Sequence, residues 1–260
     1  MRKEMPVDRF YDQMAEDYHL LYPDWGSAAS DQGAVLARLI ESSRGPARGP
    51  VLDFACGIGT QAIGLAAFGY TVTGTDMSQK AVERAAREAK KRGITSARFS
   101  AADMRRLPAE FQDAFDVAIG FDNPLAHLLK SEDMRLAALS LRTALRPGGL
   151  LLLSSRDYEQ ILVDKPTSMS FRHRTVGNKL TVIFQIWDWD AREPEYVNNH
   201  FILQKRRLGW KTVQSKTRMR ARTMQEIGTV FEEAGFTDVK WHSPQETEYF
   251  QPIMAAVSPS

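Results

Sequence analysis

The first fifty residues carry apolar side chains at helical spacing. Two apolar series recur at intervals of three and four within residues 8–42, which places side chains on one face of a helix. A break at Tyr22-Pro23-Asp24 separates them, and a loop rich in glycine and proline follows at 42–50. We therefore predict two helices before the main domain. The two series are Phe10, Met14, Tyr18 and Leu21, then Val35, Leu36, Leu39 and Ile40.

Residues 51–154 alternate between short apolar runs and longer amphipathic stretches. The short runs predict buried strands and the longer stretches predict helices. Strands that alternate with helices are typical of a parallel, doubly wound sheet. The predicted strands are 51–55, 70–75, 97–100, 115–121 and 150–154, the predicted helices are 60–68, 79–92 and 131–145, and a turn is expected at 146–149.

Residues 165–222 have a different pattern, because β-rich runs follow one another without helices between them. Such runs predict an antiparallel meander inserted into the α/β domain. The last residues return to the earlier pattern of helix and strand. The β-rich runs are 180–189, 197–205 and 211–221, and after them we predict a helix at 224–234 and strands at 237–241 and 250–257.

The composition is that of a globular protein. The 260 residues are 43% hydrophobic and 25% charged, which excludes a disordered or a fibrous chain. The net charge of +2 is too small for a general nucleic-acid binder. The longest apolar runs, such as Leu150–Leu153, fall far short of the roughly 20 residues that cross a bilayer. We see no signal peptide, and with Cys56 as the single cysteine we expect a cytoplasmic protein.

A glycine pattern follows the first predicted strand. Gly57-x-Gly59-x-x-Ala62 matches the pattern of dinucleotide-binding turns. Glycine lets the backbone turn sharply and approach a ligand without a Cβ atom in the way. Asp76 comes nineteen residues after Gly57, at the end of the second predicted strand, where a carboxylate can bind both ribose hydroxyls. A nicotinamide cofactor and S-adenosylmethionine both fit these residues.

Three further features favour S-adenosylmethionine. Asp53 precedes the glycine turn, where a carboxylate suits a cationic aminoacyl sulfonium better than a diphosphate. Asp103 and Met104 follow the third predicted strand, where the acid can accept from the adenine amino group and Met104 can pack on the ring. About fifty residues precede the first strand, whereas many nicotinamide domains begin near it. Together these features are more specific than the glycine pattern alone.

These motifs resemble those of a known family. Residues 51–60 and 73–76 resemble the first two motifs of the class I S-adenosylmethionine-dependent methyltransferases, and 103–104, 115–121 and 145–149 complete the set. The resemblance implies an α/β fold with a Rossmann-like, mixed, seven-stranded class I methyltransferase sheet, an N-terminal helical lid and an inserted antiparallel β cap. It also implies S-adenosylmethionine as cofactor and S-adenosylhomocysteine as product. Further expected cofactor contacts are Ala55, Met77 and Phe121.

This fold implies four parts of the chain. They are the lid at 1–49, the cofactor-binding core at 50–164, the β cap at 165–222 and the C-terminal completion of the core sheet at 223–260.

Two runs resemble the glycine N-methyltransferase and glycine/sarcosine N-methyltransferase group more narrowly. They are Asn123-x-x-Ala126-His127-Leu128 and Arg156-Asp157-Tyr158. The resemblance implies that Arg156 holds a substrate carboxylate and that Asn123 and His127 take part in catalysis, His127 as a general base or a hydrogen-bond donor.

This chain departs from that group at several positions. Pro124 and Leu125 replace Ser and Phe, and Asp157 replaces Asn. Phe184 and Phe201 stand near where the group would have tyrosine hydroxyls. The identity of the methyl acceptor is therefore open.

Other residues were weighed against structural roles. Tyr11 and Tyr18 are expected to contact the cofactor, because aromatic rings attract a sulfonium and this segment folds over the cofactor in the resembling family. Cys56 is expected to pack as a small residue, and the remaining histidines show no metal-ligand spacing. Residues 204–222 hold eight positive charges and no acid. We expect this stretch to be a solvated outer face, with Arg218, Arg220 and Arg222 on one side of a strand.

The function expected from these observations is methyl transfer to a small molecule. N-methylation of an amino acid or a related carboxylate-bearing amine is the first hypothesis. O-methylation of a carboxylate or a phenol, with His127 as base, is the alternative, and RNA methylation through residues 204–222 is a more distant one. We expect no metal, no nucleic-acid partner and no membrane partner, and self-association into a homo-oligomer stays open.

Overall fold

The computed structural model describes residues 6–45, 48–176 and 178–259. Its larger sheet has seven strands in the order β10-β11-β5-β4-β1-β2-β3. The first five strands of the chain pair in parallel, and β11 pairs antiparallel with β5 and β10. The predicted doubly wound sheet is confirmed. The strands are β1 (Val51–Asp53), β2 (Val72–Asp76), β3 (Ala97–Ala101), β4 (Phe115–Gly120), β5 (Leu145–Ser154), β10 (Thr237–His242) and β11 (Ile253–Val257).

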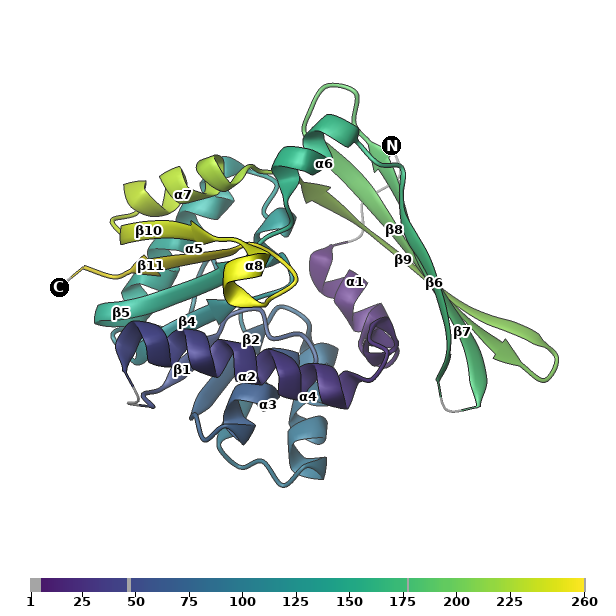
Figure 1. The fold of residues 1–260 in the computed structure, drawn as a ribbon, viewed down its shortest axis with the longest axis horizontal. Coiled ribbons are helices and arrows are strands. Elements are labelled where there is room, and N and C mark those ends of the chain that lie inside the picture. Colours follow the sequence, from purple (N-terminus) through teal and green to yellow (C-terminus); the bar gives the residue numbers. More distant parts are fainter. Residues whose placement is uncertain (1–5, 46–47, 177, 260) are drawn as a thin grey trace.

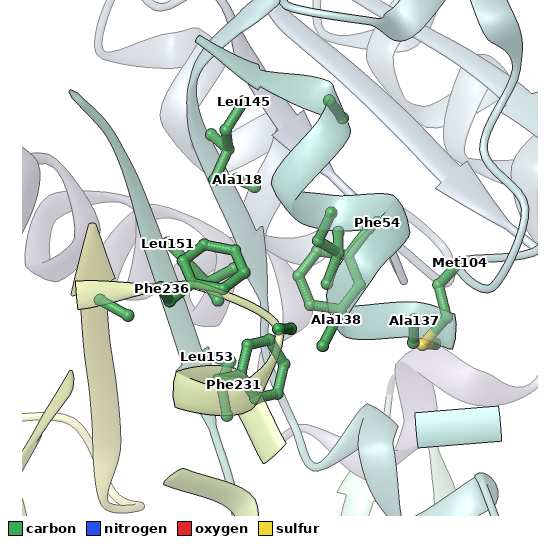
Figure 2. Packing of buried hydrophobic residues seen from close by; sticks show 14 of the residues in the cluster. Phe54, Met104, Ala118, Ala137, Ala138, Leu145, Leu151, Leu153, Phe231 and Phe236 are labelled. Atoms are coloured by element: carbon green, nitrogen blue, oxygen red, sulfur yellow. The ribbon is translucent and has the colours of Figure 1, made fainter. Parts of the chain in front are cut away.

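Helices cover both faces of this sheet (Figure 1). Alternate residues of a strand point to opposite faces, so Leu151 and Leu153 pack with α5 and α7, whereas Leu150 and Leu152 pack with α2 and α3. Figure 2 shows the first of these clusters, with Phe231 close to Leu153. The core helices are α2 (Trp25–Arg44), α3 (Thr60–Ala67), α4 (Gln79–Lys91), α5 (Ser131–Ala144) and α7 (Met224–Glu233), with short turns η2 (Ala109–Phe111), η3 (Pro124–His127) and α8 (Pro244–Thr247).

Two glycines let α2 and α3 approach each other closely. A Cβ atom on Gly33 would lie 2.5 Å from the backbone of Gly64, and one on Gly64 would lie 2.2 Å from the carbonyl oxygen of Ala29. No side chain fits at such distances. This contact fixes α2 beside the glycine loop, where the indole of Trp25 donates a hydrogen bond to Thr60 over 2.8 Å.

A second sheet forms a separate layer. Its four antiparallel strands follow the order β6-β7-β8-β9, and Figure 1 shows it as a long, twisted ribbon beside the core. Its inner face packs against α1 (Val7–Met14) through Phe10, Ile183 and Ile202, and against α6 (Tyr158–Asp164) through Tyr158 and Trp187. The antiparallel meander is thus confirmed. The strands are β6 (Ser168–Val176), β7 (Lys179–Trp189), β8 (Glu195–Arg206) and β9 (Gly209–Arg220).

The N-terminal segment lies between the two sheets (Figure 1). After α1 the chain makes a 3₁₀ turn, η1 (Tyr18–Leu21), and then enters α2. Asp12 of α1 accepts hydrogen bonds from the hydroxyl of Ser78 at 2.6 Å and from the backbone of Lys80 at 3.1 Å. Because Ser78 caps α4, α1 is attached to the end of β2 as well as to the cap sheet.

The structure corrects several predicted elements. The first strand ends at Asp53 rather than Ala55, and the chain has a cap strand, β6, that was not predicted. The expected turn at 146–149 lies inside β5 as a bulge, since two steps along β4, from Phe115 to Val117, match five along β5. Arg222 lies beyond the end of β9 and is buried, so it does not share a strand face with Arg218 and Arg220.

Among the described residues, no helix combines the length and the apolar character that crossing a membrane requires.

Candidate functional site

The glycine turn is tied to the end of the neighbouring strand. Gly57 and Gly59 have φ values of +52° and +89°, which L side chains rarely adopt. The backbone N–H of Gly57 donates to the Asp76 carboxylate over 2.9 Å, and the N–H of Ser78 donates to its other oxygen over 2.9 Å. Open space lies where a Cβ atom of Gly57 would be. The turn and Asp76 thus form one rigid unit beside that space.

A cavity of about 290 Å³ opens at this unit. It lies at the carboxyl ends of β1, β2 and β4, where open α/β sheets bind ligands. Most of the predicted cofactor residues gather here, and His127 lines the same cavity. The predicted cofactor residues in its wall are Tyr11, Tyr18, Ala55, Gly57, Asp76, Met77, Met104 and Phe121.

Three predicted cofactor residues do not line this cavity. Asp53 is buried beneath the turn with one carboxylate oxygen unpartnered, and Gly59 begins α3. The Asp103 carboxylate accepts several hydrogen bonds from the guanidinium of Arg105, the shortest 2.6 Å long. Arg105 itself lines the cavity. Asp103 therefore positions a residue of the cavity wall without lining the cavity itself.

Three carboxyl groups lie in or beneath the wall of the cavity, those of Asp53, Asp76 and Asp122. Burial, helped by the nearby carboxylates of Asp76 and Asp122, raises the pKa of the Asp53 carboxyl to about 8. Burial also raises the pKa of Asp76, although backbone N–H groups that bond to its carboxylate oppose this. Carboxyl groups held together in this way favour a cationic ligand over an anionic one.

Asp122 is a site residue that was not predicted. It follows β4 with a positive φ of 64°, which costs free energy in a residue other than glycine. Its carboxylate accepts from the hydroxyls of Tyr249 at 2.7 Å and Tyr22 at 2.9 Å, and it lines the cavity. Its place directly after a parallel strand was the signal that could have found it.

Tyr11 of α1 contacts His127 of the core. The Tyr11 hydroxyl lies 2.8 Å from Nε2 of His127, and the two rings meet edge to face. Burial, helped by the positive charge of Arg156, lowers the pKa of His127 to about 4. Burial raises the pKa of Tyr11 well above its usual value. Both side chains are therefore neutral at physiological pH.

A second, larger cavity of about 830 Å³ lies between the core and the cap sheet, and Arg156 lines it. The Arg156 guanidinium donates to the Tyr196 hydroxyl over 3.0 Å and lies 4.8 Å from the centre of the Trp187 ring. The hydroxyls of Tyr196 and Tyr158 are 3.0 Å apart. No acidic side chain among the described residues forms an ion pair with Arg156. The site therefore presents an uncompensated positive charge.

Asn123 is hydrogen-bonded to the backbone of Arg156. It is buried, and it lines neither cavity. Its side-chain oxygen accepts from the backbone N–H of Arg156 at 3.3 Å, and its amide donates to the Tyr158 hydroxyl over 2.9 Å. The geometry gives Asn123 a positioning role rather than contact with a reacting group.

Other candidates have structural roles. Cys56 is buried, and burial raises the pKa of its thiol well above the usual value. Within the described ranges, no three His, Cys, Asp or Glu side chains gather as a metal site. Arg218 and Arg220 form ion pairs with Glu195, and Lys211 with Asp17. Much of the basic stretch is therefore engaged within the protein.

Comparisons with known proteins show what the chain is similar to. Residues 51–149 match a family described as a methyltransferase domain. The glycine/sarcosine N-methyltransferase of Parasynechococcus marenigrum is 31% identical over 159 residues, which cover 60% of this chain and 55% of that protein. The chain spans about half the length of the curated relatives that it matches.

Solved structures share the fold over nearly the whole chain. The crystal structure of Streptomyces venezuelae DesVI is similar with a TM-score of 0.78 at 19% identity, and the match covers 98% of this chain and 100% of that one. The crystal structure of an S-adenosylmethionine-dependent methyltransferase from Clostridium acetobutylicum is similar with a TM-score of 0.74 at 14% identity. This match covers 96% of this chain and 99% of that one. These likenesses confirm the expected fold with its N-terminal helices and inserted β sheet.

Proposed function

We propose that this chain is a class I S-adenosylmethionine-dependent methyltransferase and that it methylates the nitrogen of a small amine that also carries a carboxylate. Arg156 is the observation that carries the proposal. Its guanidinium is partly buried on the wall of the larger cavity without an acidic partner among the described residues. An unpaired charge in such a place is costly, and an arginine fork matches both oxygens of a carboxylate.

The smaller cavity fits the cofactor. S-adenosylmethionine supplies, when bound, a methyl group activated by a sulfonium. Asp76 is placed to accept from the ribose hydroxyls, and Tyr11, Tyr18 and Met104 offer aromatic and thioether surface to the cofactor. The carboxylate of Asp122 on the cavity wall balances the positive charge of its aminoacyl end, and the buried, mostly protonated carboxyl of Asp53 lies beneath the turn.

The chain's own contribution to the reaction is mainly positioning. Arg156 fixes the acceptor's carboxylate, so that the amine meets the cofactor cavity in a defined orientation, and orientation of this kind lowers the barrier substantially. The amine must be neutral when it attacks. The nearby positive charge of Arg156 lowers the pKa of an amine, as it does for His127, and so favours the neutral form.

The state of His127 supports N-methylation over O-methylation of a phenol. A phenol, whose pKa is near 10, needs a general base with a pKa near the operating pH. The pKa of His127 lies at about 4, which makes it a weak base. Its hydrogen bond to Tyr11 instead suits a role in holding α1 against the site. The names of the curated relatives, glycine/sarcosine and glycine N-methyltransferases, also point to an amine acceptor.

The test is an acceptor scan with methyl-labelled S-adenosylmethionine. The purified protein is offered amino acids, simple amines, carboxylic acids and phenols, and mass spectrometry locates the label in each product. We expect the label on nitrogen, and only in amines that also carry an acid. Label found on oxygen, or only in amines without an acid, would refute the proposal.

A further inference from the structure

The larger cavity has room for much more than a simple amino acid. Its volume of about 830 Å³ falls in the range of roughly 300–1,000 Å³ that encloses drug-sized ligands. Resting on the proposed function, we propose that the acceptor is an extended amine. Its carboxylate binds Arg156, its body bears uncharged polar groups that bond to His200, and it ends in a second anionic group at Arg172.

His200 of the cap sheet has a buried ring nitrogen that a polar atom of a ligand could bind. It lines the cavity on β8, its side chain is only 4% exposed, and its Nδ1 has no hydrogen-bond partner. Buried polar atoms in proteins are nearly always paired, so an orphaned one calls for a partner. Burial and the charge of Arg156 lower the pKa of His200 to about 4, so the imidazole is neutral and suits a hydroxyl or an amide.

The neighbours of His200 continue this polar surface. Gln185 on β7 and Ser215 on β9 are paired with His200 across the sheet, and they separate two apolar parts of the inner face. Gln185 lines the same cavity, and the buried Ser215 hydroxyl has no partner. Because these groups are uncharged, they match an uncharged polar body rather than a charged one.

Arg172 places a second positive charge on the cavity wall. It lies on β6, it is exposed, and no acid of the described chain forms an ion pair with it. The two carboxylates that line this cavity are engaged in helix caps. Asp157 accepts from the backbone N–H of Gln160, and Glu246 accepts from Ser243. The free guanidinium therefore favours an anionic end on the acceptor.

Apolar side chains form the rest of the wall. Met169 and Phe184 of the cap and Trp241 and Phe250 of the core also line the cavity, and Phe250 is 62% exposed. Exposed aromatic rings beside a cavity are typical of a ligand-binding surface. The body of the acceptor therefore has an apolar or aromatic face as well as polar groups.

Free amino acids of graded length test this proposal. Glycine, O-phosphoserine, tyrosine and O-phosphotyrosine share one reacting amine and one carboxylate, but differ in body and in terminal anion. We measure kcat/KM for S-adenosylhomocysteine release, and the affinity of each acid for the protein loaded with S-adenosylhomocysteine. We expect kcat/KM and affinity to be about tenfold or more higher for tyrosine than for glycine. Both should be higher again, by about tenfold or more, for the better of the two phospho-acids than for tyrosine.

Variants separate this proposal from the function it rests on. Arg172→Ala should reduce the preference for the better phospho-acid over tyrosine at least about tenfold, and Arg172→Lys should restore part of it. His200→Ala should reduce the preference for tyrosine over glycine. Arg207→Ala, an exposed arginine in the turn between β8 and β9, is the matched control and should change neither ratio.

The outcomes are distinguishable. Equal values for all four acids, or ratios that Arg172→Ala and His200→Ala leave intact, overturn the extended acceptor while the proposed function stands. Loss of every preference for an acid in the acceptor scan overturns the proposed function itself.

Discussion

At the scale of single residues, three carboxyl groups lie in or beneath the wall of the smaller cavity, which we propose holds the cofactor. Asp53 is fully buried, whereas Asp76 and Asp122 are partly buried and line the cavity. Asp76 already accepts two backbone hydrogen bonds, which hold its carboxylate in one orientation. A cationic cofactor with two ribose hydroxyls matches this arrangement.

Replacing Asp76 by alanine should weaken the binding of S-adenosylmethionine. Two charge-assisted hydrogen bonds to the ribose are lost, which corresponds to about 2–4 kcal/mol after compensation by water. Calorimetry of the variant measures this directly. Glu132→Ala, at an exposed position on α5, is the control, and an unchanged affinity in Asp76→Ala would remove the assignment.

Asp53 makes the stability of the free protein depend on pH. Its folded pKa is about 8 against a usual value of 3.8, so between these values the folded state binds a proton that the unfolded state does not. The free energy of unfolding therefore falls as pH rises from about 4 to 8. Asp53→Asn should abolish this loss. Between pH 5 and pH 8 the free energy of unfolding of the variant should therefore fall by about 1–3 kcal/mol less than that of the wild type. Urea unfolding at both pH values checks it, and equal slopes in the two proteins would contradict it.

At the scale of elements, the local signals were predictable from the sequence. The glycine turn, Asp76 and the strand ends lie within short stretches, because each βα unit forms from neighbouring residues. Strand β6 was missed because Ser168–Val176 mixes Ser, His and Arg with few apolar residues. It is a strand because it pairs with β7 at the edge of the cap.

Contacts between distant residues were not predictable in the same way. Tyr196 lies forty residues from Arg156 along the chain, yet its hydroxyl accepts from the guanidinium. Phe184 and Phe201, which stood near the expected places of hydroxyls, stack on each other instead. Tyr196 and Tyr158 come together only because the cap packs against the core. No short-range sequence pattern predicts such packing.

The close contact of α2 with α3 makes a clear prediction about stability. Gly64→Ala would place a Cβ atom 2.2 Å from a backbone carbonyl oxygen, so the helices must separate, at a cost of about 1–3 kcal/mol. Gly228→Ala in α7 is the matched control, because its Cβ atom would have no neighbour nearer than 3.6 Å. It should stabilise the protein by up to about 1 kcal/mol. Thermal unfolding measures both, and a neutral Gly64→Ala would contradict the packing argument.

Residues 8–32 should behave as a lid over the cofactor. Tyr11 and Tyr18 line the cavity, and α1 is held by a few polar contacts such as that between Asp12 and Ser78. A bound cofactor adds contacts to this segment and excludes water from the site. Hydrogen exchange in 8–32 should slow when S-adenosylhomocysteine binds, while exchange in α7 should not. Equal exchange in 8–32 with and without the ligand would count against a lid.

At the scale of the whole molecule, Arg156 lies near both of the cavities described above. The N-terminal segment and the core together form the smaller cavity, and the core and the cap sheet together form the larger one. Arg156 lies close enough to lower the pKa of His127 in the first and of His200 in the second. Under the proposed function the acceptor occupies the larger cavity and the cofactor the smaller one, and the cap also touches the smaller cavity, where Thr217 of β9 lies 3.5 Å from Nδ1 of His127. The cytoplasmic location and any homo-oligomer stay predictions.

The most direct test of the proposed function compares matched amines with and without the acid. The release of S-adenosylhomocysteine is measured with glycine against methylamine and with tyrosine against tyramine, for the wild type, Arg156→Ala and Arg156→Lys. The wild type should prefer the acid-bearing member of each pair. Arg156→Ala should lose about 1.5–3 kcal/mol of that preference, one charged hydrogen-bonded contact, and Arg156→Lys should recover only part, with cofactor affinity unchanged. Full activity in Arg156→Ala, or equal rates within each pair in the wild type, would contradict the account.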